Sequence, residues 1–276
     1  MDFSSISGPT YATAQTLIQQ VAYSLSEKIF SYSPESFDLD VAAKAWLAAN
    51  TQNANGYVTH IAPMQTRRGA GTIALGYMFS KDFDLAKRHI PQSLLASSSS
   101  LYNLRSSLDQ LSLLYSVANP FVAHIAAVDY APGSSRALVT DYATALDVAE
   151  ELGLGLLSSS SAYEAQHMSL FATILATVLP TIHIYDGISV GRDTLRVIDV
   201  LNQSGLKNTY DNVLSGLSEL SKRADAEQKV AKLLNSFNDE LGTAYGLFEY
   251  HGHRDAETVL VVFGSVESSV DRKSVV

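Results

Sequence analysis

Residues 153–187 read GLGLLSSSSAYEAQHMSLFATILATVLPTIHIYDG. A short apolar segment at 154–158 precedes a long helical pattern at 162–179, and Pro180 separates that pattern from a second apolar segment at 181–186. Both short segments are apolar without strict alternation, which is typical of strands buried on both faces. The order strand, helix, strand predicts two strands of a parallel sheet and a helix that covers them.

The same alternation of segments continues on either side of this unit. Apolar spacing predicts helices over residues 14–30, 37–49, 101–115, 140–152, 194–201 and 210–237, the last interrupted at Gly216. Further strands are predicted at residues 121–128, 247–250 and 258–263. We therefore predict an α/β protein whose parallel sheet is covered by helices on both faces.

The composition excludes several classes of function. Lys and Arg number 19 against 28 Asp and Glu, and the resulting net charge of −9 argues against binding to nucleic acid or to an anionic membrane. The chain has no cysteine, which excludes thiolate catalysis and cysteine-ligated metals within this stretch. No apolar run reaches the roughly 18 residues of a membrane helix, and no secretory signal is visible. The expected location is the cytoplasm.

Residues 187–191 (GISVG) match G-x-S-x-G, the nucleophile motif of α/β-hydrolases, between a predicted strand and a predicted helix. Ser189 would need an acid and a histidine downstream, and Asp211 with His251 or His253 could supply them. An acidic residue directly before the motif and an Arg-Asp pair after it do not suit a tight nucleophile turn. A polar turn at the end of a strand is the favoured interpretation.

Residues 69–74 (GAGTIA) match the loose dinucleotide fingerprint G-x-G-x-x-A. A true fingerprint follows a strand directly, whereas residues 64–68 (MQTRR) are polar. Close packing of a helix through small residues is the favoured interpretation.

The histidines do not predict a metal site. His124 and His183 lie inside apolar strands, where a core histidine is the commoner explanation. His251 and His253 could chelate weakly, but no third ligand has a diagnostic spacing.

Polar residues gather where the predicted parallel strands end. Asp186 and Gly187 follow one strand, and serine clusters at 97–100 and 158–161 lie at other strand-to-helix junctions. Ligands of open α/β sheets bind at this edge. Turn formation and helix capping explain the same residues without a ligand, so the residues alone predict no chemistry.

Several stretches in sequence order resemble the amino-terminal half of the pyruvate:ferredoxin oxidoreductase family, whose domain has a thiamine-diphosphate-binding fold. Residues 157–187 are similar to its segment of serine cluster, helix, proline and terminal Asp-Gly strand, and residues 29–36 (IFSYSPES) to its "YPITPSS" turn. The strand at 121–128 also has a counterpart there. Residues 255–265 (DAETVLVVFGS) resemble the first strand of the family's second domain, a transketolase-carboxyl-terminal-like unit.

A closer resemblance is to a second family, the flavoprotein (alpha) components of fungal NADPH-dependent sulfite reductases, which carry this module in their amino-terminal region. It rests on three stretches: residues 68–76 (RGAGTIALG), 140–152 (TDYATALDVAEEL) and 248–268 (FEYHGHRDAETVLVVFGSVES).

The resemblance divides the chain into parts. Residues 1–9 are expected to be a loose amino terminus, 10–252 the pyrimidine-domain-like unit, and 253–270 the first strand of a truncated second domain. Residues 271–276 (DRKSVV) are expected to be a non-native tail, because GATCGGAAGAGCGTCGTG, the start of a common sequencing adapter, encodes them.

The resemblance also places a vestigial cofactor cleft. Pyruvate:ferredoxin oxidoreductases carry a glutamate just before the glycine-rich helix, in a pattern like "SEAGA", and it hydrogen-bonds the thiamine aminopyrimidine. Arg68 stands at that position here, and a cation cannot accept the proton. Ser33, Arg68, Ser97, Asp186 and Gly187 are the candidate cleft residues; no catalytic residue and no metal ligand is predicted.

The function implied by the resemblance is that of an amino-terminal fragment of the flavoprotein subunit. The parent enzyme would pass electrons from NADPH through FAD, with FMN as a further candidate, to a hemoprotein (beta) subunit that carries sirohaem and an iron–sulfur cluster. That enzyme reduces sulfite to sulfide for cysteine biosynthesis. Flavin and NADPH would bind in a carboxyl-terminal part or a partner subunit, and this segment would be an inactive assembly domain. The alternative is a thiamine-diphosphate-dependent 2-oxoacid:acceptor oxidoreductase subunit.

Overall fold

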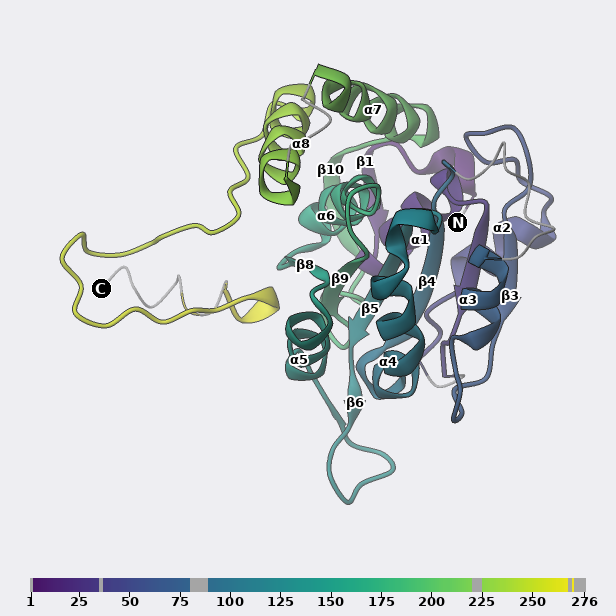
Figure 1. Ribbon diagram of the computed structural model, residues 1–276, viewed down its shortest axis with the longest axis horizontal. Coiled ribbons are helices and arrows are strands. Elements are labelled where there is room, and N and C mark those ends of the chain that lie inside the picture. The colour runs from purple at the N-terminus through teal and green to yellow at the C-terminus, as the bar shows by residue number, and fades with distance from the viewer. Residues whose placement is uncertain (1, 35–36, 80–88, 220–224, 268–269, 271–276) are drawn as a thin grey trace.

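The computed structural model describes residues 2–34, 37–79, 89–219, 225–267 and 270. Figure 1 shows a central sheet with helices packed against its faces. The sheet has six parallel strands in the order β3-β2-β4-β5-β9-β8. In that order the strands span His60–Pro63, Lys28–Ser31, Gln92–Ser97, Phe121–Ala127, Thr181–Asp186 and Gly155–Ser159.

The helices α1 to α8 surround this sheet. In chain order they span Ala14–Leu25, Val41–Ala48, Thr72–Phe79, Ser98–Leu113, Ala143–Leu152, Ala162–Leu175, Gln203–Ser215 and Ala226–Leu241. Neighbouring residues of a strand point to opposite faces of the sheet. Accordingly Ile29 of β2 packs in one core with α1 and α2, whereas Phe30 packs in another with α3, α4 and α5. Helix α6 packs against α1, and α7 and α8 cover both from outside.

The central strands explain why the apolar segments do not alternate. Every residue of β4, β5 and β9 is buried. A strand with helices on both faces has no solvent-facing side, so it gains nothing from polar residues at every second position. The predicted parallel sheet with helices on both faces is confirmed.

An antiparallel pair, β1 (Gly8–Ala12) and β10 (Leu195–Val200), lies apart from this sheet. It corrects the prediction of a helix at residues 194–201. Residues 2–9, the described part of the segment predicted to be loose, contain a short helix and the start of β1. Val197 and Val200 are buried in the pair, because β-branched residues pack well on a strand. The short helix η1 (Phe3–Ser5) and the fully buried Ile6 lead into β1.

Several predicted boundaries also differ. Residues 14–30 are not one helix, because α1 ends at Leu25 and β2 begins at Lys28. Strands β2, β3 and β4 have no counterpart in the predictions, since apolar runs this short cannot be separated from helix by spacing alone. Residues 210–237 hold the end of α7, the short helix η4 (Gly216–Glu219) and most of α8.

Beyond α8 the chain forms an arm, residues 243–263, without helix or strand. The predicted strands at 247–250 and 258–263 are therefore wrong for this structure. A strand needs a neighbour for its backbone hydrogen bonds, and none of the described strands pairs with this segment. In Figure 1 the arm leaves the molecule at α8 and returns to it in the short helix η5 (Gly264–Val266). The domain boundary at 252 stays a prediction, and the predicted tail 271–276 lies outside the described residues.

Three minor elements complete the architecture. Strands β6 (Asp129–Tyr130) and β7 (Leu138–Val139) form a small hairpin, and η3 (Tyr115–Val117) follows α4. Among the described residues, every helix is too short or too polar to span a bilayer.

Candidate functional site

The candidate cleft residues lie along one edge of the sheet. Ser97 and Asp186 end β4 and β9, Gly187 follows β9, Ser33 follows β2, and Arg68 lies in the loop after β3. Because these strands are parallel, their carboxyl ends meet at the same edge, where ligands of open sheets bind. The hydrogen bonds of Ser33, Ser97 and Asp186 form three separate groups.

Hydroxyl groups fill the part of this edge between β2 and β4. Ser97 Oγ lies 2.7 Å from Ser99 Oγ and 3.3 Å from Ser100 Oγ. Ser100 Oγ donates to Tyr32 O at 3.2 Å and receives the Thr66 hydroxyl at 3.3 Å. These four hydroxyls, which we call the hydroxyl cluster, join β2, β4 and the loop after β3. Their bonds to one another give the serines a structural role.

Ser33 orders the turn after β2. Its hydroxyl accepts the Leu39 amide at 2.9 Å and donates to Pro34 O at 3.0 Å. Like the hydroxyl cluster, it is satisfied by the chain itself.

The loop after β3 presents cations where a thiamine site needs an acid. Residues 64–71 read MQTRRGAG, and Arg67 and Arg68 are both exposed. A carboxylate is the group that the pyruvate oxidoreductase resemblance requires at Arg68. The residues present therefore do not fit thiamine diphosphate, and we derive no chemistry through it.

Glycine at the end of this loop has a packing role. Gly71 has φ +86°, and its amide donates to the Tyr32 hydroxyl at 2.8 Å. A Cβ there would lie 2.7 Å from Ser107 Cβ of α4, closer than side-chain atoms approach. The predicted close packing of a helix through the small residues of 69–74 is confirmed.

Asp186 is the centre of a saturated hydrogen-bond group. Its Oδ1 accepts the amides of Ile188 and Ser189 at 2.7 and 2.9 Å, and its Oδ2 accepts the hydroxyls of Ser189 and Ser265 at 2.8 and 2.7 Å. Burial alone would raise the pKa of Asp186, but the hydrogen bonds from Ser265, Ser189 and Ile188 outweigh it and hold the pKa below the ordinary 3.8. An ionised carboxylate with four donors orders its turn and is poorly suited to proton transfer.

Gly187 lets β9 approach β5 closely. A Cβ at this position would lie 2.9 Å from Ala126 Cβ.

The hydrolase interpretation of residues 187–191 has no assembled triad. The Ser189 hydroxyl donates to Asp186, and Asp211 forms an ion pair with Lys207 one helical turn away. His251 and His253 lie exposed on the arm. The favoured polar turn agrees with this geometry.

His124 and His183 form a buried pair on β5 and β9. Their Nδ1 atoms lie 3.4 Å apart, and His183 Nε2 lies 3.1 Å from Ser159 Oγ. Burial lowers the pKa of His124 to about 3 and that of His183 well below its ordinary value. Both are neutral core side chains, as predicted. Within the described part of the chain, no three His, Asp or Glu residues gather as metal ligands would.

Two residues of the Asp186 group were not predicted from the sequence: Tyr142 and Ser265. The Ser265 amide donates to the Tyr142 hydroxyl at 3.2 Å, while the Ser265 hydroxyl binds Asp186. These residues come from distant parts of the chain, and no motif links them.

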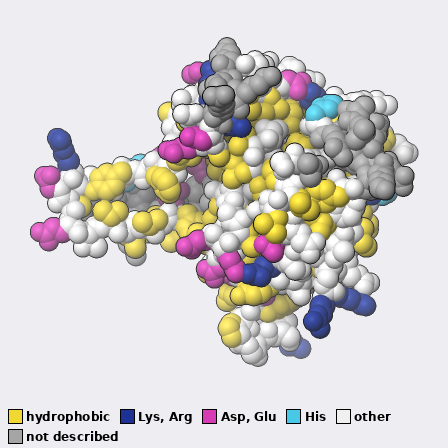
Figure 2. Space-filling view, viewed as in Figure 1, with side chains coloured by type: hydrophobic (Ala, Val, Ile, Leu, Met, Phe, Trp, Pro, Cys, Tyr) yellow, Lys and Arg dark blue, Asp and Glu magenta, His cyan; other side chains and the backbone are white. Residues whose placement is uncertain are grey.

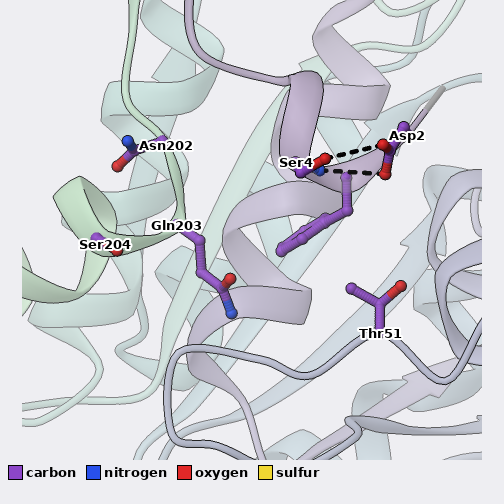
Figure 3. Close-up of a pocket in the computed structure, with 7 residues that line it drawn as sticks. Asp2, Ser4, Thr51, Asn202, Gln203 and Ser204 are labelled. Carbon is purple, nitrogen blue, oxygen red and sulfur yellow. Dashed lines mark hydrogen bonds between the residues drawn. The ribbon is translucent and has the colours of Figure 1, made fainter.

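A cleft of about 250 Å³ lies elsewhere, between the amino terminus and the start of α7. Figure 3 shows that the Asp2 carboxylate turns to Ser4, whose amide and hydroxyl it accepts at 3.3 and 2.8 Å. The lining residues are Asp2, Phe3, Ser4, Thr51, Asn202, Gln203 and Ser204. This set includes none of the candidate cleft residues, and its one charged group is already bonded.

No protein-family model matches the sequence. The chain is 26% identical to the probable sulfite reductase [NADPH] flavoprotein component of Schizosaccharomyces pombe and 26% identical to the sulfite reductase [NADPH] flavoprotein component of Saccharomyces cerevisiae, over 95% of its length in each case. It is 25% identical to the pyruvate:ferredoxin oxidoreductase of Moorella thermoacetica over 91% of its length.

The chain spans about a quarter of the length of these relatives: 25%, 24% and 23%. Among solved structures, the 2-oxoglutarate:ferredoxin oxidoreductase of Magnetococcus marinus aligns with 90% of this chain and 48% of its own, at 12% identity and a TM-score of 0.48. The sequence matches confirm the resemblance stated above on its motifs, and the six-stranded parallel sheet agrees with the fold class that the resemblance implies. Over nearly its whole length, this chain is thus similar to the fungal sulfite reductase flavoprotein components and to the pyruvate oxidoreductases.

Proposed function

We propose that this chain is a module of the flavoprotein component of an NADPH-dependent sulfite reductase, and that it serves assembly and not catalysis. The observation that carries the proposal is the similarity to two yeast flavoprotein components over 95% of the chain. Both proteins are about four times as long as this chain, so the chain would take part in their activity only as one part of a larger enzyme.

In that enzyme, electrons would pass from NADPH through FAD, with FMN as a further candidate, to a hemoprotein (beta) subunit with sirohaem and an iron–sulfur cluster. Sulfite would be reduced to sulfide by six electrons for cysteine biosynthesis. This module would hold none of these cofactors and would be inactive alone. The satisfied Asp186 and the arginines at 67–68 support a non-catalytic role.

The arm supports a role in protein contact. Phe248, Leu260 and Val261 are 91%, 71% and 80% exposed. Figure 2 shows hydrophobic side chains gathered along this arm. Contiguous exposed apolar groups are typical of surfaces that contact a partner.

A chimera tests the proposal. The region of the S. cerevisiae flavoprotein component that aligns with this chain would be replaced by residues 2–267, and the chimera expressed in yeast lacking its own flavoprotein gene. We expect growth on sulfate as the only sulfur source and co-purification of the hemoprotein subunit. A flavoprotein with the same region deleted is the control. Folded, flavin-loaded chimera that neither supports growth nor binds the hemoprotein would contradict the assembly role.

The pyruvate oxidoreductase relatives favour one alternative, a thiamine-diphosphate-dependent 2-oxoacid:acceptor oxidoreductase subunit. Calorimetric titration with thiamine diphosphate and Mg²⁺ separates the two. We expect no binding to this chain, because Arg67 and Arg68 stand in a loop without a carboxylate. Binding of thiamine diphosphate at micromolar or lower Kd by the unaltered chain would favour the alternative over the assembly role.

A further inference from the structure

The carboxyl-terminal end of the arm returns to the sheet edge. We call residues 263–266 the strap. The arm is also held at its start, where Tyr245 lies with its hydroxyl 2.8 Å from His167 Nδ1 and pairs its backbone with the Asn238 side chain. The residues between, 246–262, are mostly exposed and form neither helix nor strand. The strap is therefore joined to the body by a length of chain that can move without disturbing the core.

Contacts with Asp186 and Tyr142 seat the strap. The Ser265 hydroxyl donates to Asp186 Oδ2 at 2.7 Å, and the Ser265 amide donates to the Tyr142 hydroxyl at 3.2 Å. The rings of Phe263 and Tyr142 meet edge to face with centroids 5.3 Å apart. Gly264 is buried with φ +75°, and a Cβ there would lie 2.2 Å from Tyr142 Cζ. The backbone thus lies directly on Tyr142, in a place that only glycine fits.

The location of the strap matters because Asp186 ends β9 at the carboxyl edge, where open α/β sheets bind their ligands. Asp186 is 3% exposed with the strap in place. Ser265 supplies one of its four hydrogen bonds, and the other three come from the turn directly after β9. Removal of the strap would leave a carboxylate that is still ordered by its own turn but has one oxygen open to a donor.

The strap is held by contacts with Tyr142 and Asp186 and by packing of η5 beside β8 and β9, and not by a hydrogen-bond ladder like that of the sheet. Segments held in this way open locally at a lower free energy than the whole fold. We propose that the strap is a latch on the carboxyl edge: closed, it covers Asp186 and Tyr142, and open, it exposes them while the sheet stays folded. This inference rests on the geometry alone and not on the proposed sulfite reductase role.

Amide hydrogen exchange on the full chain tests the latch. In the unaltered chain, we expect the Ser265 amide to exchange more slowly than an unprotected amide but faster than the amides of β9. Gly264→Val places a side chain against Tyr142 and should hold the latch open. It should speed exchange at Ser265 roughly 10-fold or more, as expected for loss of hydrogen bonds that include one to a charged group. Amides within Thr181–Asp186 should be unchanged.

Two variants sharpen the comparison. Ser265→Ala keeps the amide bond to Tyr142 but loses the bond to Asp186, so it should give an intermediate rate at residue 265. Val261→Ala, in an exposed part of the arm, should match the unaltered chain. An unprotected Ser265 amide in the unaltered chain would overturn the proposal, because the strap would then not be seated. Equal rates at Ser265 and β9, rising together in Gly264→Val, would also overturn it, because the strap would then be part of the cooperative core.

Discussion

At the scale of single residues, the buried side-chain amides of Gln20 and Gln166 join helices α1 and α6 to the backbone beside β1 and β10. Gln166 of α6 uses both ends of its amide: Nε2 donates to Gln20 Oε1 at 2.7 Å and to Leu201 O at 3.0 Å, while Oε1 accepts the Leu201 amide at 2.9 Å. Gln20 of α1 in turn donates to Ile6 O at 3.2 Å. Ile6 and Leu201 flank the same end of the antiparallel β1–β10 pair, and the two glutamines give the buried backbone there its hydrogen-bond partners.

Gln166→Leu is expected to lower the free energy of unfolding by about 3 kcal/mol. The substitution keeps the volume but leaves the Leu201 amide and the Gln20 carbonyl buried without these partners. Denaturant unfolding followed by the fluorescence of Trp46, the one tryptophan, measures the change. Gln203→Leu is the control, because that amide makes a single exposed bond to Gln52 O, and its loss should cost below about 1 kcal/mol. Equal effects of the two substitutions would contradict the role of Gln166.

At the scale of elements, the contact between α3 and α4 depends on the absence of a side chain at Gly71. Gly71 directly precedes α3, whereas Gly76 lies within that helix, and a Cβ at Gly76 would meet nothing within 4 Å. The same substitution, glycine to alanine, made separately at Gly71 and Gly76 therefore distinguishes the effect of close packing on stability from the effect of helix propensity.

Gly71→Ala should destabilise the chain by about 2 kcal/mol or more, because the new methyl group meets Ser107 and the backbone φ of +86° is strained for alanine. Gly76→Ala should instead stabilise it by about 0.5 to 1 kcal/mol, since alanine favours the helix. Thermal unfolding of the two variants checks the prediction. Stabilisation by both would show that α3 does not pack on α4 as described.

At the scale of the whole molecule, buried neutral histidines tie stability to pH. Burial lowers the pKa of His124 to about 3 and of His167 to about 4, and burial together with the neighbouring His124 lowers that of His183. In the unfolded chain these side chains titrate near the ordinary 6.5. Below that pH the unfolded chain binds more protons than the folded chain, so stability is full above about pH 6.5 and is lost as the pH falls toward the folded pKa values.

The free energy of unfolding should fall by about 1 kcal/mol for each of the three histidines between about pH 7.5 and about pH 5.5. Asp186, with its pKa held below 3.8, stays ionised in this window. Denaturant unfolding at several pH values measures the slope. His124→Leu should reduce the slope by about a third. A slope unaffected by His124→Leu would mean that this histidine titrates alike in both states.

Some features of the candidate site could be predicted from the sequence, and others could not. Its location at one sheet edge could be predicted, because the Asp-Gly turn at 186–187 and the serine cluster at 158–161 follow strands that the apolar pattern identified. The absence of a carboxylate from residues 64–71 was also visible in the sequence. The residues that surround Asp186 could not be predicted, because Tyr142 and Ser265 belong to segments far from it in the chain.

The α/β class, most elements after residue 100 and the family resemblance can be predicted from the sequence, because they depend on the local spacing of apolar residues and on the order of motifs. The strand at residues 195–200, the burial of Ile6 and the contact of Ser265 with Asp186 became known from the folded chain. Each of these depends on hydrogen bonds or packing between segments distant in sequence. The local sequence is the same whether or not a strand has a neighbour to pair with, and whether or not a carboxylate has a hydrogen-bond donor. The folded arrangement distinguishes these cases.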